Sequence, residues 1–349
     1  MRRAVFAIPG DLDTVTGGYL YERRLLEGLR EVGTDVVHLP LGATFPDPSA
    51  ADHAHAVEAM TAVDAATPLI LDGFVFGSID PAALARIAPP IVGMVHHPLA
   101  HEEGLDAARR AHLFRTERDN LRVADAVLVP SPHTARILVD EYGADPARIT
   151  VARPGTDRPT GRRTPVEPPL ILSVGIRHAR KGHDVLLRAL ALVTDLEWTA
   201  TIVGSAYDAE HAADLSRLRA QLGLDDRVGF AGEVPVARRD ALYRRASVFA
   251  LATRYEGYGI VFDEALAHGL PIVSCRTGAV PDTVPADAGL LVPPDDPDSF
   301  ADALRVLLQD GVRRSAMSKA AADAGASLPS WLDTARTAQA VLDALAPTS

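Results

Sequence analysis

The amino-acid sequence predicts an α/β protein with two parallel-sheet domains. Short apolar runs alternate with amphipathic stretches, which is typical of parallel strands joined by helices that cover the sheet. The alternation stops once, in an Arg-, Pro- and Thr-rich segment near the middle of the chain, and then begins again. A chain of 349 residues has room for two such domains. We therefore expect ligands to bind off the carboxyl ends of the strands in each half.

The composition narrows the class of protein. Apolar residues make up 47% of the chain and charged residues 23%, as in a soluble globular protein with a substantial core. No apolar run approaches the ~20 residues of a membrane span, and Pro9-Gly10-Asp11 interrupts the N-terminal run before a signal-peptide core forms. We expect a cytoplasmic protein. A net charge of −11 argues against general nucleic-acid binding, and Cys275, the only cysteine, excludes an internal disulfide.

Six strands are expected in the first half, at residues 4–8, 35–39, 69–71, 91–95, 126–129 and 149–151. The loop after the first strand ends in Gly17-Gly18 and leads into a helix with an apolar stripe. On a later helix, Arg115, Arg118 and Arg122 share one side. This side is either a solvated face or a contact for phospholipid headgroups, so peripheral membrane binding stays open.

The fourth strand ends in a histidine-rich turn, His96-His97-Pro98-Leu99-Ala100-His101. His97 and His101 have the spacing of a helical metal pair, but no third ligand is evident, so we predict no metal site. The turn is otherwise explained by histidine and proline residues that satisfy local hydrogen bonds. After the fifth strand, helix capping is enough to explain Ser131 and Thr134.

Six further strands are expected in the second half, at residues 170–175, 198–203, 228–230, 248–252, 271–274 and 290–292. The loop after the first of them carries three cations, Arg177, Arg180 and Lys181, where this type of fold binds a diphosphate. Lysine otherwise occurs only at Lys319, so the placement of Lys181 is informative. The alternative is a basic loop that is simply solvated.

The segment from Tyr255 to Glu264 joins a buried strand, a glycine-spaced turn and a helix start. Gly257 and Gly259 allow the backbone to approach a ligand, and the free N–H groups of the first helical turn favour an anion. Glu256 and Glu264 would repel that anion, so we assign them to sugar hydroxyls, which are hydrogen-bond donors. The alternative is two solvated acids near a helix start.

These two glutamates, with seven residues between them, resemble the signature of the retaining glycosyltransferases of family 4. The run from Ala265 to Val273 and the later Gly278-Ala279-Val280-Pro281-Asp282 complete the resemblance. In that family the fold is GT-B, in which two Rossmann-like parallel-sheet domains face each other across a cleft. The family usually has Gly-Gly and Pro-Glu where this chain has Gly278-Ala279 and Pro281-Asp282, so the contacts of that loop stay open.

The resemblance assigns roles in the second half. Arg180 and Lys181 match the basic motif that neutralises the leaving diphosphate in place of a metal ion, with Arg177 displaced by one position from the commoner spacing. Glu256 is expected near the donor sugar hydroxyls, and Glu264 on the ribose. The residues expected around the nucleotide are Gly204, Gly232, Val234, Gly257, Tyr258 and Gly259. Backbone groups in these loops would contact the base, and such contacts do not reveal which base it is.

The resemblance also covers two features of the first half. His96 is similar to the family's active-site histidine near the anomeric centre and the acceptor. Gly17 and Gly18 resemble a loop close to the donor phosphate or the acceptor, although they lack the G-x-G-x-x-G spacing of a dinucleotide fingerprint. Asp11 and Asp13 have the D-x-D spacing of the metal site in the other large glycosyltransferase fold, but we favour a loop near the acceptor.

Four segments are therefore expected: an acceptor domain at residues 1–157, a linker at 158–168, a nucleotide-sugar domain at 169–327, and a C-terminal helix at 328–349 that crosses back to the first domain. The predicted function is metal-independent transfer of a sugar, with retention, from a nucleotide diphosphate sugar to a hydroxyl acceptor, either a small molecule or a glycan. UDP-sugars are the first expectation for the donor and GDP-sugars the second, and no cofactor is expected.

Three alternatives stay open. The first is transfer to a lipid-linked acceptor at a membrane surface. The second is a GT-B phosphorylase or epimerase, and the third is a non-catalytic module that binds sugar nucleotides. The sequence does not specify the acceptor, the transferred sugar, the base or the oligomeric state.

Overall fold

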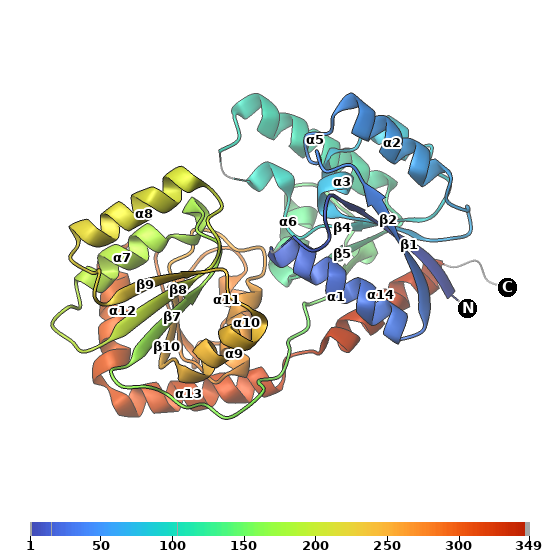
Figure 1. Ribbon diagram of the computed structural model, residues 1–349. Helices are drawn as coiled ribbons and strands as arrows, with labels where there is room; N and C mark the ends of the chain where they lie inside the picture. The colour runs from blue at the N-terminus through green and yellow to red at the C-terminus, as the bar shows by residue number, and fades with distance from the viewer. Residues whose placement is uncertain (1, 15, 103, 346–349) are drawn as a thin grey trace. The chain divides into compact units, whose positions relative to one another are not determined.

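The chain forms two compact units, as the computed structural model shows (Figure 1). The structure describes residues 2–14, 16–102 and 104–345. The first unit is Met1–Gly155 together with Pro329–Ser349, and the second is Thr156–Leu328.

The first unit contains a six-stranded parallel sheet in the order β2-β1-β3-β4-β5-β6. Its strands are β1 (Arg2–Pro9), β2 (Thr34–Leu41), β3 (Leu69–Leu71), β4 (Ile91–Met94), β5 (Ala126–Val129) and β6 (Ile149–Val151). Phe6 packs with Val92 in the core on one face, and Ala7 packs with Leu71 on the other, as alternation along a strand requires. The strand order reverses between β1 and β3, and open α/β sheets bind ligands at such a reversal.

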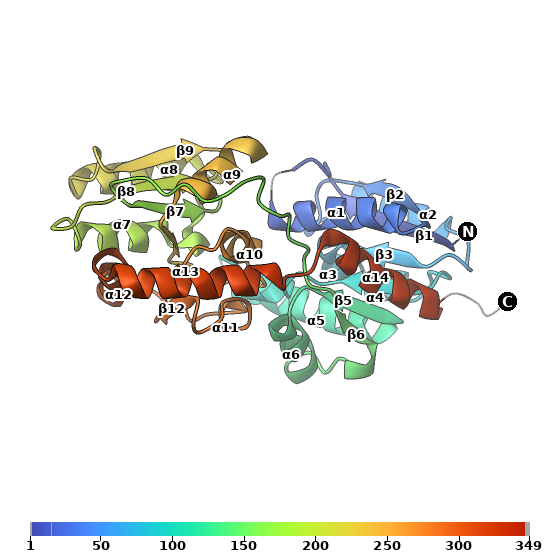
Figure 2. The same ribbon diagram turned by 90° about the horizontal axis from the view of Figure 1, so that it is seen from below.

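Helices cover both faces of this sheet. They are α1 (Gly17–Glu31), α2 (Ala50–Thr61), α3 (Gly73–Ser78), α4 (Pro81–Leu84), α5 (Ala107–Val123), α6 (Pro132–Asp140) and α14 (Trp331–Leu345), with the 3₁₀ turns η1 (Leu99–His101) and η2 (Pro146–Arg148). Figures 1 and 2 show α14 beside α1. A Cβ on Gly28 would lie 2.9 Å from the Cβ of Ala335, and Gln339 donates a hydrogen bond to the Val32 carbonyl at 3.1 Å. Small residues therefore allow α14 to complete the core over α1.

The second unit contains another six-stranded parallel sheet, in the order β12-β11-β10-β7-β8-β9. Its strands are β7 (Leu170–Val174), β8 (Thr199–Val203), β9 (Val228–Gly232), β10 (Val248–Leu251), β11 (Ile272–Cys275) and β12 (Gly289–Val292). Read from β9, this is the strand order of a doubly wound nucleotide-binding fold, and it reverses between β7 and β10. The loops that follow β7 and β10 are therefore brought together.

The helices of the second unit are α7 (His183–Ala191), α8 (Ala209–Gln221), α9 (Val236–Arg245), α10 (Ile260–Ala267), α11 (Val280–Thr283), α12 (Pro297–Gln309) and α13 (Gly311–Ala326), with the 3₁₀ turn η3 (Ala179–Lys181). Leu187 and Leu304 belong to the core on one face of the sheet, and Tyr243 and Phe262 to the core on the other. Each predicted strand overlaps one of the strands in the two sheets.

Two segments of chain lead between the units, and each is held where it leaves a unit. In the second unit, Arg158 donates hydrogen bonds to the carbonyl oxygens of Gly325 (2.6 Å) and Leu328 (3.2 Å). In the first unit, a Cβ on Gly155 would lie 2.2 Å from the backbone nitrogen of Trp331. The two segments therefore lie side by side at both ends.

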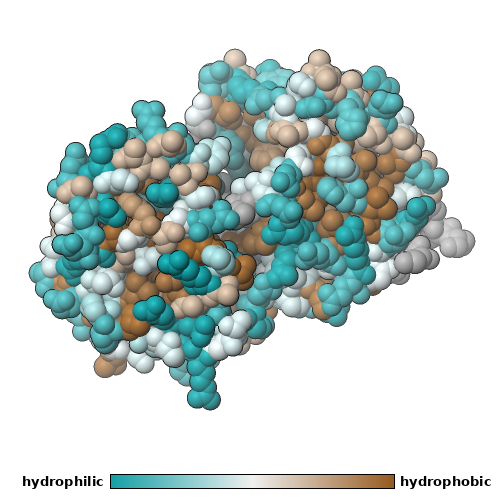
Figure 3. All heavy atoms as spheres, viewed as in Figure 1, coloured by the Kyte–Doolittle hydropathy of each residue, from teal (hydrophilic) through white to brown (hydrophobic). Residues whose placement is uncertain are grey.

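The surface carries no continuous apolar band on the face drawn in Figure 3, where hydrophilic side chains are interspersed with hydrophobic ones over both units. Among the described residues, no helix combines the length and the apolar content that crossing a bilayer requires. Of the three arginines predicted to share one side of a helix, Arg118 and Arg122 both contact the carboxylate of Asp119, at 3.0 and 2.9 Å. Part of the charge that would attract anionic headgroups is therefore neutralised within α5.

Glu117 on α5 is a fully buried acid in the core of the first unit. The Leu99 N–H donates to its Oε2 at 3.2 Å. Burial raises the pKa of Glu117 to about 8, against the opposing effect of hydrogen bonds from Leu99 and Tyr142. This pKa lies above the 4.5 of an ordinary glutamate, so the folded protein holds the proton more tightly than the unfolded chain does. The free energy of unfolding therefore falls as the pH rises from 4.5 to about 8.

We predict that Glu117→Gln makes the protein less sensitive to high pH. Between about pH 5 and about pH 9, the Tm of the variant minus that of the wild type should increase by roughly 3 °C or more, because only the wild type must ionise this buried carboxyl. Thermal unfolding across this pH range measures the effect. Glu210→Gln, at an exposed position on α8, is the control. Parallel Tm curves for the wild type and Glu117→Gln would contradict the prediction.

Candidate functional site

The loop after β7 places a lysine against the end of β10. Gly182 has a left-handed φ of 61° between η3 and α7, and a Cβ there would come 1.9 Å from the Ala252 carbonyl oxygen. Only glycine allows this approach of the two loops. The Nδ1 of His178 accepts a hydrogen bond from the Arg180 N–H at 3.1 Å, which caps η3. The Lys181 side chain is thereby directed across the reversal point of the sheet.

Lys181 and Glu256 form a buried ion pair. The lysine Nζ lies 2.6 Å from Oε1 of Glu256, and the two residues are 9% and 4% exposed. Thr253 Oγ1 donates to the same oxygen at 3.0 Å, and an Arg180 Nη lies 3.5 Å from Oε2. These contacts connect three of the predicted site residues, Lys181, Arg180 and Glu256, in one corner.

The ionisation of this corner is set by opposing effects. Burial raises the pKa of Glu256, but Lys181 and Arg180 together lower it below its usual value, so the carboxylate is charged. Burial lowers the pKa of Lys181, and the attraction of Glu256 opposes that shift. The result is a paired ammonium and carboxylate with a second cation, Arg180, beside them.

The turn after β10 exposes the start of α10. Gly259 has a φ of 88° and is the N-cap of Ile260–Ala267, so the cap residue supplies no side-chain hydrogen bond to the first turn, whose Phe262 N–H donates to the Gly259 carbonyl at 2.9 Å. A Cβ on Gly259 would meet the Phe262 ring at 2.5 Å. The start of α10 therefore lies close to Glu256, since the same Cβ would come 3.6 Å from the Glu256 Cγ.

A later loop supports this turn. Gly278 has a φ of 51°, and a Cβ there would lie 2.3 Å from the Glu256 carbonyl oxygen, whereas Ala279 has an ordinary φ of −81°. The Ala279 N–H donates to the Glu256 carbonyl at 2.8 Å, and Thr283 Oγ1 donates to the Tyr258 carbonyl at 3.0 Å. The departure from Gly-Gly thus falls on the position that tolerates a side chain.

Glu264 is held by two residues that the sequence analysis missed. Tyr243 donates its hydroxyl to one carboxylate oxygen at 2.8 Å, and Arg239 lies 3.2 Å from the other. Burial, with the neighbouring Glu264, raises the pKa of Tyr243, so the phenol remains a donor. Both residues lie on α9 four positions apart, which puts them on one face of the helix. The four-residue spacing of Arg239 and Tyr243 was the feature of the sequence that could have identified them as a pair.

Arg177, the third predicted cation, contacts strand β9 and the loop that follows β8. Its guanidinium lies over the Phe230 ring, 5.4 Å from the centroid, and its N–H donates to the Ser205 carbonyl at 2.8 Å. Neighbouring loops meet here, since Gly204 donates from its N–H to the Gly232 carbonyl at 2.8 Å. Val234 follows and is partly buried against the core that contains Tyr243. The ends of β7, β8 and β9 are therefore in contact.

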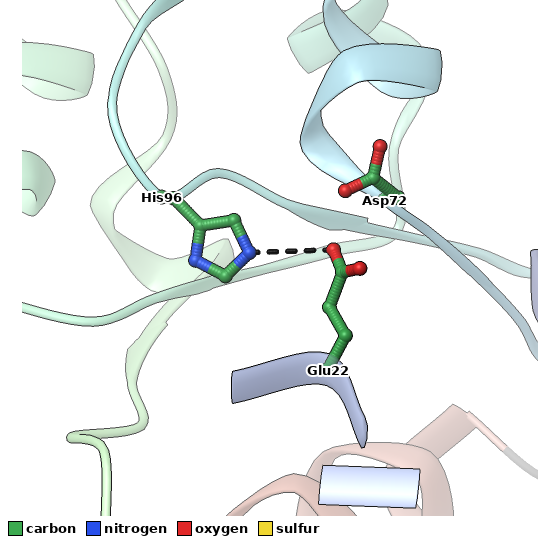
Figure 4. A group of neighbouring side chains, drawn as sticks. All are labelled: Glu22, Asp72 and His96. Atoms are coloured by element: carbon green, nitrogen blue, oxygen red, sulfur yellow. Dashed lines mark hydrogen bonds and ion pairs between the residues drawn. The ribbon is translucent and has the colours of Figure 1, made fainter. Parts of the chain in front are cut away.

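A second cluster lies in the first unit. His96 follows β4, and its Nε2 is 3.3 Å from Oε1 of Glu22 on α1 (Figure 4). Asp72, directly after β3, lies beside them. Gly17 begins α1, and a Cβ on Gly18 would lie 3.6 Å from the His96 ring. His96 and Gly18 are thus neighbours.

Glu22 and Asp72 were missed by the sequence analysis. An acid within the apolar stripe of α1, three residues before Leu25, was the available signal for Glu22. The two histidines with the spacing of a helical metal pair, His97 and His101, do not share a partner. His97 contacts Glu102 at 2.7 Å, and His101 contacts Glu141 at 3.0 Å. Among the described residues, the group of acids and histidines that lies within 4.8 Å consists of Glu22, Asp72 and His96.

The D-x-D pair is a local turn. The Asp13 N–H donates to Oδ1 of Asp11 at 2.9 Å, and the Asp13 carboxylate lies 3.4 Å from Arg23. Both acids are exposed, and neither belongs to the cluster around His96. Their geometry is that of a loop stabilised by its own hydrogen bonds.

Two family models match adjoining parts of the chain. Residues 159–324 match the one described as "Glycosyl transferases group 1", and residues 70–158 match "Glycosyltransferase Family 4". The chain belongs to glycosyltransferase family 4. The family predicted from the spacing of Glu256 and Glu264 is confirmed.

Relatives with similar sequences are named D-inositol 3-phosphate glycosyltransferase. The protein of a Nocardioides species is 33% identical over 295 residues, which are 74% of this chain and 63% of that protein. The protein of Corynebacterium aurimucosum is 34% identical over 220 residues, which are 57% of this chain and 52% of that protein. The matched parts therefore span between half and two thirds of these family 4 relatives.

Solved structures of low sequence identity share the fold. Sucrose-phosphate synthase from Thermosynechococcus elongatus superposes with a TM-score of 0.84 at 22% identity, covering 99% of each chain. Anabaena HepE, in complex with UDP and glucose, gives a TM-score of 0.80 at 16% identity and covers 99% of this chain and 100% of its own. The GT-B fold predicted from the sequence is confirmed.

We predict that the family 4 loop at Gly278 is sensitive to a single methyl group. Gly278→Ala should lower the free energy of unfolding by roughly 1–3 kcal/mol, because the new Cβ meets the Glu256 backbone and the positive φ is strained. Urea denaturation measures this loss. The adjacent Ala279→Gly is the control, and its cost should be about 1 kcal/mol or less. Equal losses in the two variants would contradict the prediction.

Proposed function

We propose that this protein transfers a glycosyl group from a nucleotide diphosphate sugar to a hydroxyl acceptor, with retention of configuration and without a metal ion on the diphosphate. The observation that carries the proposal is the corner formed by Lys181, Arg180 and Glu256 beside the uncapped start of α10. Family membership supports it, as do the relatives named D-inositol 3-phosphate glycosyltransferase.

The leaving group is stabilised by fixed positive charge. As the bond between the anomeric carbon and the phosphate oxygen breaks, negative charge grows on the diphosphate. We assign Lys181 and Arg180, with N–H groups at the start of α10, to stabilise that charge. Because these donors are held by the sheet, little reorganisation is needed when the bond breaks.

The Lys181–Glu256 pair is assigned to both the diphosphate and the donor sugar. In the protein described here the carboxylate neutralises the ammonium at 2.6 Å. When a diphosphate binds, its oxygens compete for Lys181, and the Glu256 oxygens become available to accept hydrogen bonds from donor sugar hydroxyls. One ion pair thereby serves as the resting state of a phosphate site and a sugar site.

Glu264 is assigned to the ribose. Tyr243 and Arg239 fix its two oxygens, and each oxygen keeps capacity to accept a further hydrogen bond. Two neighbouring ribose hydroxyls match this pair of acceptors. Backbone groups of Gly204, Gly232, Val234 and Tyr258 are assigned to the nucleotide, and UDP is the first candidate, since the neighbour HepE was solved with UDP.

Retention follows if the acceptor attacks from the face that the diphosphate leaves. The acceptor oxygen bonds to the anomeric carbon, the carbon–phosphate oxygen bond breaks, and the acceptor proton passes to that phosphate oxygen. His96, with Gly17 and Gly18 near it, is assigned to the sugar or the acceptor. The first unit is accordingly proposed as the acceptor domain, and the second as the nucleotide-sugar domain.

We predict that Lys181→Ala removes most of the thermal shift that a matching nucleoside diphosphate produces, while the smaller shift from its nucleoside remains. UDP, GDP, ADP and dTDP form the panel, and each shift is measured against the variant's own baseline. Lys181→Gln, which retains a donor for Glu256 but no charge, should lose the same response. Lys319→Ala is the matched control, because the other lysine of the chain is exposed and pairs with Asp323. An undiminished diphosphate shift in Lys181→Ala would contradict the proposal.

We predict that Tyr243→Phe weakens UDP binding through the ribose. Loss of the hydrogen bond to Glu264 should raise the Kd for UDP by about three- to tenfold. Calorimetry with UDP and with 2′-deoxy-UDP tests the assignment, because the substitution should cost less when one ribose hydroxyl is already absent. If Tyr243→Phe lowered the affinity for UDP and for 2′-deoxy-UDP equally, the assignment of Glu264 to the ribose would be contradicted.

A further inference from the structure

The cluster around His96 lies at the point where the first sheet reverses its order. Glu22 reaches it from α1, Asp72 from the end of β3, and His96 from the end of β4 (Figure 4). The three side chains converge, with ligand-type atoms within 4.8 Å of one another. Three separate elements therefore direct polar groups to one position.

Each acid in the cluster has one oxygen that is already engaged. Oδ1 of Asp72 accepts hydrogen bonds from the N–H groups of Phe74 (2.8 Å) and Val75 (3.4 Å), and Oε1 of Glu22 contacts the His96 Nε2. Oε2 of Glu22 is buried and accepts no hydrogen bond from any donor in the described residues. One oxygen of Glu22 and one oxygen of Asp72 lie within 4.8 Å of each other, so the two acids are close enough to share a proton.

The charge of the pair supports a shared proton. In the described part of the chain, neither acid forms an ion pair with lysine or arginine. Two buried carboxylates that lie this close together without a cation between them cannot both remain ionised. Burial raises the pKa of Glu22 to about 7 and also raises the pKa of Asp72. One proton therefore stays with the pair near neutral pH.

Burial separates the roles within the cluster. The His96 side chain is 24% exposed, whereas that of Glu22 is 1% exposed and Asp72 is 4% exposed. A substrate can reach the imidazole, but the carboxyl groups lie behind it. The Tyr21 ring and the imidazole form a T-shaped pair with centroids 5.3 Å apart, and Tyr21 is itself fixed by a 2.7 Å hydrogen bond to the Ala152 carbonyl.

We propose that Glu22 and Asp72 are positioning residues, which hold one proton between them and orient His96 toward the hydroxyl acceptor. This inference rests on the proposed function. Since Glu22 accepts at Nε2, the imidazole carries its proton there, and Nδ1 remains an acceptor. Figure 4 shows Nδ1 on the side of the ring away from Glu22. His96 thus accepts a hydrogen bond from a neutral hydroxyl and does not donate to an anionic group.

The tautomer of His96 is the direct test. In ¹⁵N-histidine-labelled protein near pH 7.5, the His96 signals, assigned by comparison with His96→Gln, should report a neutral ring protonated at Nε2. Glu22→Met fills a similar volume in the apolar stripe of α1 but removes the acceptor, so the variant should fold and lose the preference for this tautomer. An unchanged tautomer in Glu22→Met would overturn the proposal.

Kinetics separate positioning from simple stability. Glu22→Met should lower kcat by roughly tenfold or more while the KM for the donor stays near that of the wild type. Asp72→Ala should also lower kcat, and Asp72→Asn should recover most of that loss, because its amide can donate to Glu22 as a protonated acid does. Equal losses in Asp72→Ala and Asp72→Asn would contradict a shared proton.

Two further outcomes have definite meanings. If Zn²⁺ or Mn²⁺ raises the Tm of the wild type but not that of Glu22→Met, the cluster binds a metal ion and the shared-proton proposal is overturned. If the Nε2–H tautomer depends on Glu22 but no donor and acceptor give turnover, the orientation of His96 is supported and the proposed function fails.

Discussion

The buried ion pair between Lys181 and Glu256 is the interaction on which the second unit's site depends. It joins the loop after β7 to the loop after β10 across the reversal of the sheet, at a separation of 2.6 Å. The left-handed glycine at Gly182 and the close approach of Gly278 to the Glu256 backbone both serve this contact. Removing either partner would leave a buried charge uncompensated, which is far more costly than losing an exposed pair.

The two units solve the same electrostatic problem in different ways. Each places a buried glutamate at the carboxyl edge of its sheet, Glu256 in one and Glu22 in the other. In the second unit the balancing charge is an ammonium, which the proposed function pairs with a phosphate when the donor binds. In the first unit the balance comes from a proton shared with Asp72, which suits a site for neutral hydroxyls.

Much of the fold was predictable because its signals are local. Each strand is a short apolar run, and the spacing from Glu256 to Glu264 is fixed by one turn and one helix. The scarcity of lysine was a compositional signal that pointed to Lys181. These features depend on neighbouring residues, so periodicity and motif spacing were sufficient to identify them.

The remaining contacts depend on tertiary packing. Arg177 lies over Phe230, a residue more than 50 positions away, and its own loop gives no sign of that partner. The contact between Glu22 and His96 spans 74 positions and depends on how α1 sits over the ends of β3 and β4. Sequence spacing predicts which residues share an element, but it does not predict which elements bring their side chains together.

The return of α14 to α1 also has a consequence for the order of folding during translation. The helix that completes the core over Gly28 is synthesised only after all of Thr156–Leu328. The second unit can therefore reach its native structure on the ribosome while the first still exposes an apolar face. A nascent chain would hold that uncovered surface for the time needed to make more than 170 residues, which makes it a natural place for a chaperone to bind.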